Sequence, residues 1–214
     1  MKRISTLLIA AAALLAAACT RPGASGTRPT DSAESYARAV EELARRIDTQ
    51  RFKIYGIRIA EREALSDDLF QVTVQLVNAE DQTFTQTLFL NGMEPSNLSE
   101  GSLRDAPRYA ATRGIDPAAL DPAAIAAQIA RARELLPEGY TYRSVGAYCI
   151  DEEVPASSAF LNRNRQIGRQ NTSLTLLFTE DGKETESSGG RTATIYYEAT
   201  ARVADDGAVV LEEN

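Results

Sequence analysis

Hydrophobic and polar residues alternate along much of the chain, and this pattern predicts several β-strands. The clearest is residues 69–77, in which every second residue from Phe70 to Leu76 is apolar, as expected for a strand with one buried face. Residues 52–61 carry apolar groups at both alternating positions, which indicates a strand covered on both faces. Similar patterns predict further strands at residues 83–90, 140–150, 172–178, 191–203 and 208–211.

Two other segments repeat apolar residues at helical spacing and predict amphipathic helices. The first is residues 31–48, with Asp31 and Glu34 in the positions of a capping box. The second is residues 122–136, which follows Asp121 and begins with a proline, a combination that favours a helix start. The apolar stripes are Tyr36, Val40, Leu43 and Ile47 in the first helix and Ile125, Ile129, Ala132 and Leu136 in the second.

The order of these elements predicts an α+β fold of two αβββ-type units, with an antiparallel sheet and both helices on one face. The units would be residues 31–92 and 121–214, with Gly56 of the first aligned on Gly146 of the second. Residues 93–120 would be a linker or a crossing loop. The layout is similar to PepSY-like and beta-lactamase-inhibitor-like tandem folds, and one half resembles a cystatin. These likenesses are of element order alone, so they assign no residue a role.

The N-terminus has the pattern of a signal peptide over residues 1–18: two basic residues followed by a short, alanine-rich apolar run. The run ends at Leu15-Ala16-Ala17-Ala18-Cys19, which resembles a bacterial lipobox, although leucine is commoner where Ala16 stands. The resemblance implies cleavage before Cys19 and lipid on its thiol and its new amino group. The alternatives are an ordinary secreted protein cut nearby and a hydrophobic N-terminus that is never cut. Residues 19–30 would form a flexible tether.

Charge and the lipobox together predict where the protein resides. The precursor has 23 basic and 30 acidic residues, and losing Lys2 and Arg3 leaves a net charge of 21 − 30 = −9. Such a chain repels phosphate backbones, so no nucleic-acid partner is expected, and attachment to a membrane would depend on the acyl chains. Thr20 follows the cysteine where aspartate would signal retention, so the resemblance implies the periplasmic face of the outer membrane.

The residues that usually carry chemistry are scarce. The chain has no histidine and two cysteines, so lipidation of Cys19 would leave Cys149 without a disulfide partner. Cys149 is either a redox-active or partner-linking thiol, or a small residue of the core. Without histidine the usual serine triad and most zinc sites are excluded. We expect no catalytic set, no metal site and no cofactor.

The most unusual stretch is residues 162–171, which concentrates arginines and side-chain amides in an otherwise acidic chain. Arg163, Arg165 and Arg169 are candidate ligand-binding residues, because guanidinium groups and amides suit carboxylates, phosphates or glycan hydroxyls. The alternative is that these arginines neutralise the carboxylates of residues 151–153. Five tyrosines of the second half either form a recognition surface or pair across strands under the helix: Tyr140, Tyr142, Tyr148, Tyr196 and Tyr197.

Together these features predict a lipid-anchored cell-envelope protein that acts as a non-enzymatic binding or interaction module, with an envelope protein or a glycan as partner. Two alternatives remain open. One is a hydrolase that uses carboxylates on a peptide or glycan, which would need two facing acids in a concave pocket. The other is a structural subunit of an envelope complex, held through residues 93–120.

Overall fold

The computed structural model describes residues 27–101, 107–155, 160, 162–188 and 191–212. The predicted signal peptide, Cys19 and the tether up to residue 26 lie outside the described residues. The helical elements are α1 (Ala33–Arg46), two short 3₁₀ helices η1 (Tyr109–Ala111) and η2 (Pro117–Ala119), and α2 (Pro122–Glu134). The strands are β1 (Phe52–Glu61), β2 (Leu69–Asn78), β3 (Thr83–Phe89), β4 (Ser99–Glu100), β5 (Tyr140–Glu152), β6 (Gln170–Glu180), β7 (Thr185–Ser188), β8 (Arg191–Thr194), β9 (Tyr197–Val203) and β10 (Val209–Leu211).

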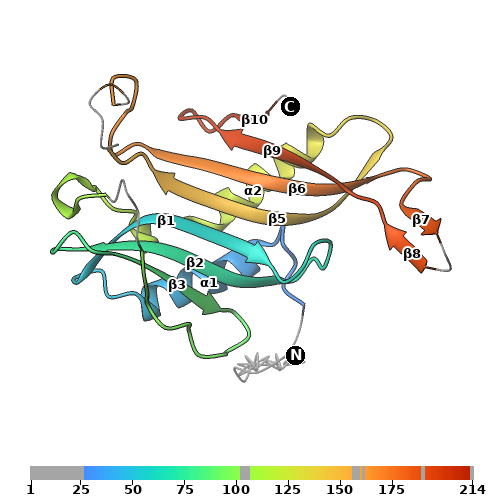
Figure 1. The fold of residues 1–214 in the computed structure, drawn as a ribbon. Coiled ribbons are helices and arrows are strands. Elements are labelled where there is room, and N and C mark those ends of the chain that lie inside the picture. The colour runs from blue at the N-terminus through green and yellow to red at the C-terminus, as the bar shows by residue number, and fades with distance from the viewer. Residues whose placement is uncertain (1–26, 102–106, 156–159, 161, 189–190, 213–214) are drawn as a thin grey trace, which may run out of the picture.

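The strands form one large antiparallel sheet, which confirms the α+β class with an antiparallel sheet (Figure 1). Its order is β10-β9-β6-β5-β1-β2-β3-β4, and β7 and β8 form a separate two-stranded hairpin that extends beyond it. The central pair is β1 with β5, in which Arg58 lies opposite Cys149 and Ile59 opposite Tyr148. The first and second halves of the chain therefore meet as neighbouring strands in the middle of one sheet.

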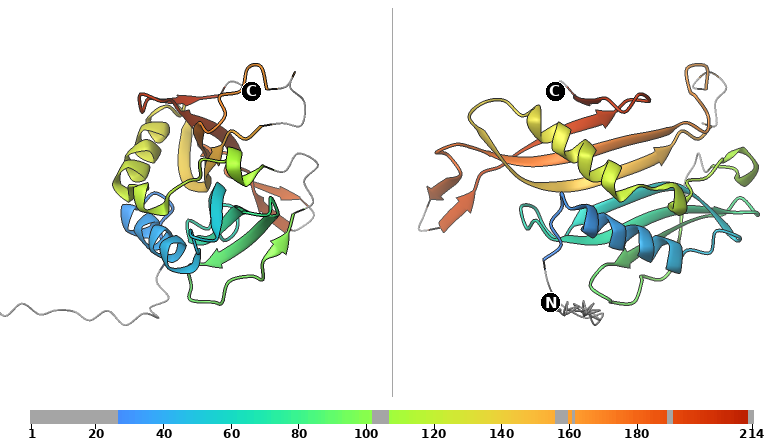
Figure 2. Two further views of the ribbon diagram at one scale, coloured as in Figure 1. Left: turned by 90° about the vertical axis from the view of Figure 1, so that its left-hand side faces the viewer. Right: turned by 180° about the vertical axis from the view of Figure 1, so that it is seen from behind.

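The hydrophobic core lies between the helices and one side of this sheet. Tyr36, Leu43 and Ile129 of the helices are fully buried against alternating strand residues such as Ile59 and Leu176. Figure 2 shows α1 and α2 lying side by side along the sheet.

The start of α1 differs from the prediction. Asp31, which the sequence placed in a capping box, instead pairs with Arg133 of α2 at 2.6 Å, and Ser32 precedes the helix without a side-chain cap. In the described parts of the chain, no helix is both long and apolar enough to span a bilayer.

Some strand boundaries differ from the prediction. The single strand predicted over residues 191–203 is divided into β8 and β9, because the chain leaves the main sheet at residues 195–196, where the Ile195 N–H bonds the Glu184 carbonyl. β7 and the two-residue β4 were not predicted. Both are short and polar, so their sequences carry no hydrophobic alternation that would reveal a strand.

The connection between the halves packs against the sheet over its described parts, residues 93–101 and 107–120. Ile115 is buried and its N–H bonds the Ile54 carbonyl at 2.7 Å. The Lys53 ammonium donates to the carbonyl groups of Tyr109 and Thr112 at 2.8 and 2.7 Å. Asp121 accepts a bond from the Ala123 N–H at 2.9 Å and caps α2 as the sequence indicates.

Candidate functional site

The side of the sheet that faces away from the core is a broad polar surface, which we call the open face. Figure 1 is viewed from this side, with the helices behind the strands. Directly paired residues of antiparallel strands point to the same face, so the strand registers identify the residues that lie on it. The open face contains Gln71, Thr73 and Gln75 of β2, Arg58 and Ala60 of β1, Ala147, Cys149 and Asp151 of β5, Asn171, Ser173 and Thr175 of β6, and Glu198, Thr200 and Arg202 of β9.

Two depressions lie on the open face. The first, of about 440 Å³, is lined by both small or apolar and charged residues; its lining includes Arg58, Ala60, Glu63, Gln71, Gly146, Thr175, Leu177 and Glu198. The second, of about 650 Å³, extends to the β5–β6 loop; its lining includes Asp151, Glu153, Asn164, Gln166, Arg169, Asn171, Ser173, Thr200, Arg202 and Glu212. Polar side chains predominate in both.

Arg58 and Cys149 meet at the centre of the open face. The Arg58 guanidinium lies 3.6 Å from the Cys149 sulfur, and among the described residues it makes no ion pair within 4.0 Å. Burial raises the pKa of the Cys149 thiol, and Arg58 only partly offsets this. The thiol is therefore protonated at neutral pH and is a weak nucleophile.

A β-bulge decides which side Cys149 faces. Strict alternation along β5 would place Val145, Ala147 and Cys149 on one face of the strand, but the register shifts between Val145 and Ala147. Val145 consequently points into the core, whereas Cys149 is half-buried on the open face. The interpretation of Cys149 as a small core residue is thus wrong, because the extra residue at the bulge reverses the alternation.

The structure separates the three arginines that the sequence singled out. Arg169 lines the second depression and pairs with Asp205 at 3.0 Å. Arg165 donates to the Val154 carbonyl at 2.7 Å, at the base of the loop. The Arg163 guanidinium stacks over the Phe160 ring, 5.3 Å from its centroid. Of the three, only Arg169 contributes to a concave surface.

These arginines do not neutralise the acidic run of residues 151–153 as the alternative interpretation expected. The Glu152 carboxylate accepts the backbone N–H groups of Arg113 and Gly114 at 2.7 and 2.6 Å. The Glu153 carboxylate accepts the Gln166 N–H at 3.0 Å. Both acids therefore fix loops through backbone groups, a use of carboxylates that spacing in the sequence does not reveal.

Most of the tyrosines pack rather than form a surface. Tyr148 is buried and its ring meets Tyr36 edge-on at 5.7 Å. Tyr140 and Tyr197 contact Phe178 at the end of the sheet near the β7–β8 hairpin. Tyr196 and Tyr197 keep about two-fifths of their surface exposed, at 39% and 41%.

Among the described residues, no group of three or more Cys, Asp or Glu side chains is placed to hold a metal ion.

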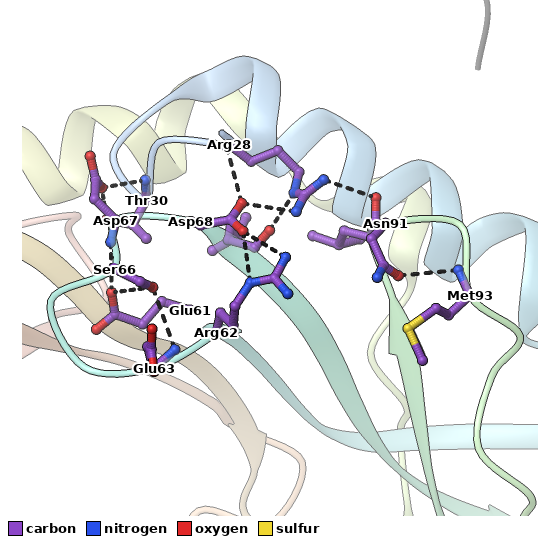
Figure 3. A network of polar contacts seen from close by, with 12 residues as sticks. Arg28, Thr30, Glu61, Arg62, Glu63, Ser66, Asp67, Asp68, Asn91 and Met93 are labelled. Carbon is purple, nitrogen blue, oxygen red and sulfur yellow. Dashed lines mark hydrogen bonds and ion pairs between the residues drawn. The ribbon is translucent and has the colours of Figure 1, made fainter. Parts of the chain in front are cut away.

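A buried polar network, which we call the N-terminal clamp, fixes the chain where it enters the domain (Figure 3). It consists of Arg28, Thr30, Glu61, Asp67 and Asp68. Arg28 pairs with Asp68 at 2.8 Å and donates from Nε to the Leu69 carbonyl at 2.6 Å. The predicted tether reached residue 30, but Arg28 and Thr30 are buried in the domain.

Thr30 and Glu61 extend the clamp to the second half of the chain. The Thr30 hydroxyl donates to Asp67 at 2.6 Å and accepts the Val145 N–H at 2.8 Å. Glu61 accepts the Asp67 N–H at 3.1 Å and lies 3.2 Å from the Ser144 hydroxyl. Burial raises the pKa of the Glu61 carboxyl even though these hydrogen bonds oppose it. Sequence analysis did not reveal the clamp, because its residues come from segments far apart in the chain.

Comparison of the chain with protein-family models, curated proteins and solved structures finds no match. The candidate site therefore rests on the geometry described above.

Proposed function

We propose that this protein is a lipid-anchored cell-envelope protein whose sheet domain is a non-enzymatic binding module. The observation that carries the proposal is the open face, a polar sheet surface with two adjoining depressions lined by side chains from both halves of the chain. A concave surface with convergent polar groups is the usual form of a ligand site. Its thiol is protonated and its arginines mostly act on neighbouring acids, which supports binding rather than catalysis.

The anchor in this proposal is Cys19, after cleavage of residues 1–18, and the expected location is the periplasmic face of the outer membrane. The N-terminal clamp supports the arrangement, because it holds the chain at Arg28 and leaves residues 19–26 to span from lipid to domain. A coil of that length reaches roughly 16 Å. Such a tether would keep the domain close to the bilayer.

The fold itself supports a duplicated origin, in which two αβββ units share one sheet with both helices on one face. From the centre of the sheet, β1, β2 and β3 follow one another outward in one direction, and β5, β6 and β9 follow one another outward in the other. Each set follows its own helix. In this arrangement the first depression of the open face is lined by residues of both units, and the second by residues of the second unit alone.

The anchor is tested by labelling cells with a radioactive fatty acid. We expect the wild-type protein to incorporate the label and the Cys19→Ser variant to incorporate none, because the acyl chains are bonded to the thiol and the amino group of that residue. A Cys149→Ser variant is the matched control and should be labelled like the wild type. Label retained in Cys19→Ser would contradict the anchor.

The binding role is tested by capture from envelope extract on the immobilised full-length protein. Thr175→Trp fills the first depression and should abolish capture of the bound component. Thr85→Trp is the matched control, since Thr85 lies opposite Gln75 on the same face but outside both depressions. Equal capture by the two variants would show that the open face is not the binding surface.

A further inference from the structure

The two depressions of the open face lie next to each other along β6 and β9, and we call them together the trough. The first is lined by Thr175 and Glu198, and the second by Ser173 and Thr200. Ser173 and Thr175 are two residues apart in β6, as are Glu198 and Thr200 in β9, so in each strand both side chains point to the same face. Thr175 lies directly opposite Thr200. From Leu177 to Asn171 the trough extends about 20 Å, at roughly 3.3 Å for each strand residue. An elongated ligand would fit this shape.

The backbone of β6, the middle strand of this region, is engaged along both edges. β6 pairs with β5 along one edge and with β9 along the other. An extended peptide is recognised on a sheet mainly by adding a strand to an exposed edge. β6 offers no such edge, whereas β9 pairs with β10 only over Ala201–Val203. Recognition over β6 must therefore come from side chains that project from the face.

Many of those side chains carry hydroxyl or amide groups and none of them is aromatic, while Leu177, Val203 and Val210 add apolar surface. Thr175, Thr200 and Ser173 present hydroxyls, and amides come from Gln71, Asn164, Gln166 and Asn171. Hydroxyl and amide groups both donate and accept hydrogen bonds. This is the complement of a ligand whose surface is covered with hydroxyl groups that also donate and accept.

The charges of the trough restrict the ligand further. Its lining contains six carboxylates (Glu61, Glu63, Asp151, Glu153, Glu198 and Glu212) and three guanidinium groups (Arg58, Arg169 and Arg202). Two of these guanidinium groups already have carboxylate partners, Arg169 with Asp205 and Arg202 with Glu212. An acidic or phosphorylated ligand would therefore meet an excess of negative charge.

From these observations we infer that the trough binds an uncharged oligosaccharide, with successive sugar units lying along β6 and β9. This assignment rests on the proposed binding role of the open face and names the ligand class for it. The Thr and Ser hydroxyls and the Asn171 amide bond the sugar hydroxyls, and Arg58 is the one guanidinium of the trough without an ion pair in the described chain. The carboxylates exclude acidic glycans.

The test is calorimetric titration of the full-length protein, purified in detergent, with three probes. These are N-acetylated chitotetraose as a neutral glycan, tetragalacturonate as an acidic one, and a glycine–serine hexapeptide as an extended chain. We expect chitotetraose to bind, tetragalacturonate to bind at least tenfold more weakly, and the hexapeptide to give no heat. Preference for the acidic sugar or for the peptide would overturn the inference.

Variants locate the binding. Thr200→Val removes one hydroxyl from the trough and should weaken chitotetraose binding about fivefold, as the loss of one hydrogen bond predicts. Thr85→Val makes the same change outside the trough and should leave binding unchanged. Ser173→Arg obstructs the trough without touching the core and should abolish binding. It is the second variant, to be used if Thr200→Val perturbs folding. If no glycan binds while capture from envelope extract persists, the proposed ligand class is wrong and the binding role stands. If neither glycan binding nor capture is observed, both the ligand class and the binding role are wrong.

Discussion

Replacement of Arg28 by alanine is expected to lower the free energy of unfolding by about 3 kcal/mol, because it breaks a buried ion pair and leaves Asp68 with only its partly exposed partner Arg62. The side chains of Arg28 and Asp68 are only 7% and 13% exposed. The same change removes the hydrogen bond from Arg28 to the Leu69 carbonyl, at 2.6 Å. Urea unfolding monitored by circular dichroism measures the loss.

Arg38→Ala is the matched control, since it also removes a guanidinium but from an exposed helical pair with Glu34 at 2.7 Å. Such a pair contributes about 0.3–0.5 kcal/mol. Equal effects of the two substitutions would contradict a structural role for the clamp.

The pH dependence of the Arg28→Ala effect has a definite sign. Burial alone would raise the pKa of Asp68, but hydrogen bonds from Arg62 and Arg28 outweigh it and hold that pKa below its ordinary value. A carboxyl with a lowered folded-state pKa stabilises the protein above its unfolded pKa, and this contribution is lost as the pH falls through the folded value. The stability gap between wild type and variant should therefore narrow as the pH falls below about 4.

The sequence revealed the local elements of this fold much better than their partners. β1 lies at the predicted residues, and β2 extends one residue beyond its prediction, because a strand with a buried face must carry apolar residues at fixed intervals. The pairing of β1 with β5 joins residues about ninety positions apart. No local pattern specifies it, since any two strands with suitable faces satisfy the same alternation.

The candidate site was less predictable for two reasons. Arg58 was passed over because it is a single cation within an apolar strand, and its place at the centre of the open face depends on the pairing of β1 with β5. Arg28 lies in a segment rich in proline and glycine, whose composition is typical of a linker. Its partner Asp68 is forty residues away in a turn, so only the folded chain shows that the two meet.

Truncation of a core residue in either helix is expected to destabilise both halves of the molecule together. Leu43 of α1 and Ile129 of α2 are fully buried in the same core. Leu43→Ala and Ile129→Ala should each lower the free energy of unfolding by about 3 kcal/mol, through lost burial and the cavity left behind. Because the halves share the central β1–β5 pair, the protein should keep a single cooperative transition.

Hydrogen exchange measured by mass spectrometry distinguishes this outcome from that of two independent lobes. In one cooperative unit, Ile129→Ala lowers protection in β2 of the first half as much as in β6 of the second, and Leu43→Ala gives the same profile. Val210→Ala, at a side chain that is 53% exposed, should change protection in neither. If Ile129→Ala loosened only the second half, the central strand pair would not couple the halves, and a trough built from both would lose its rigid frame.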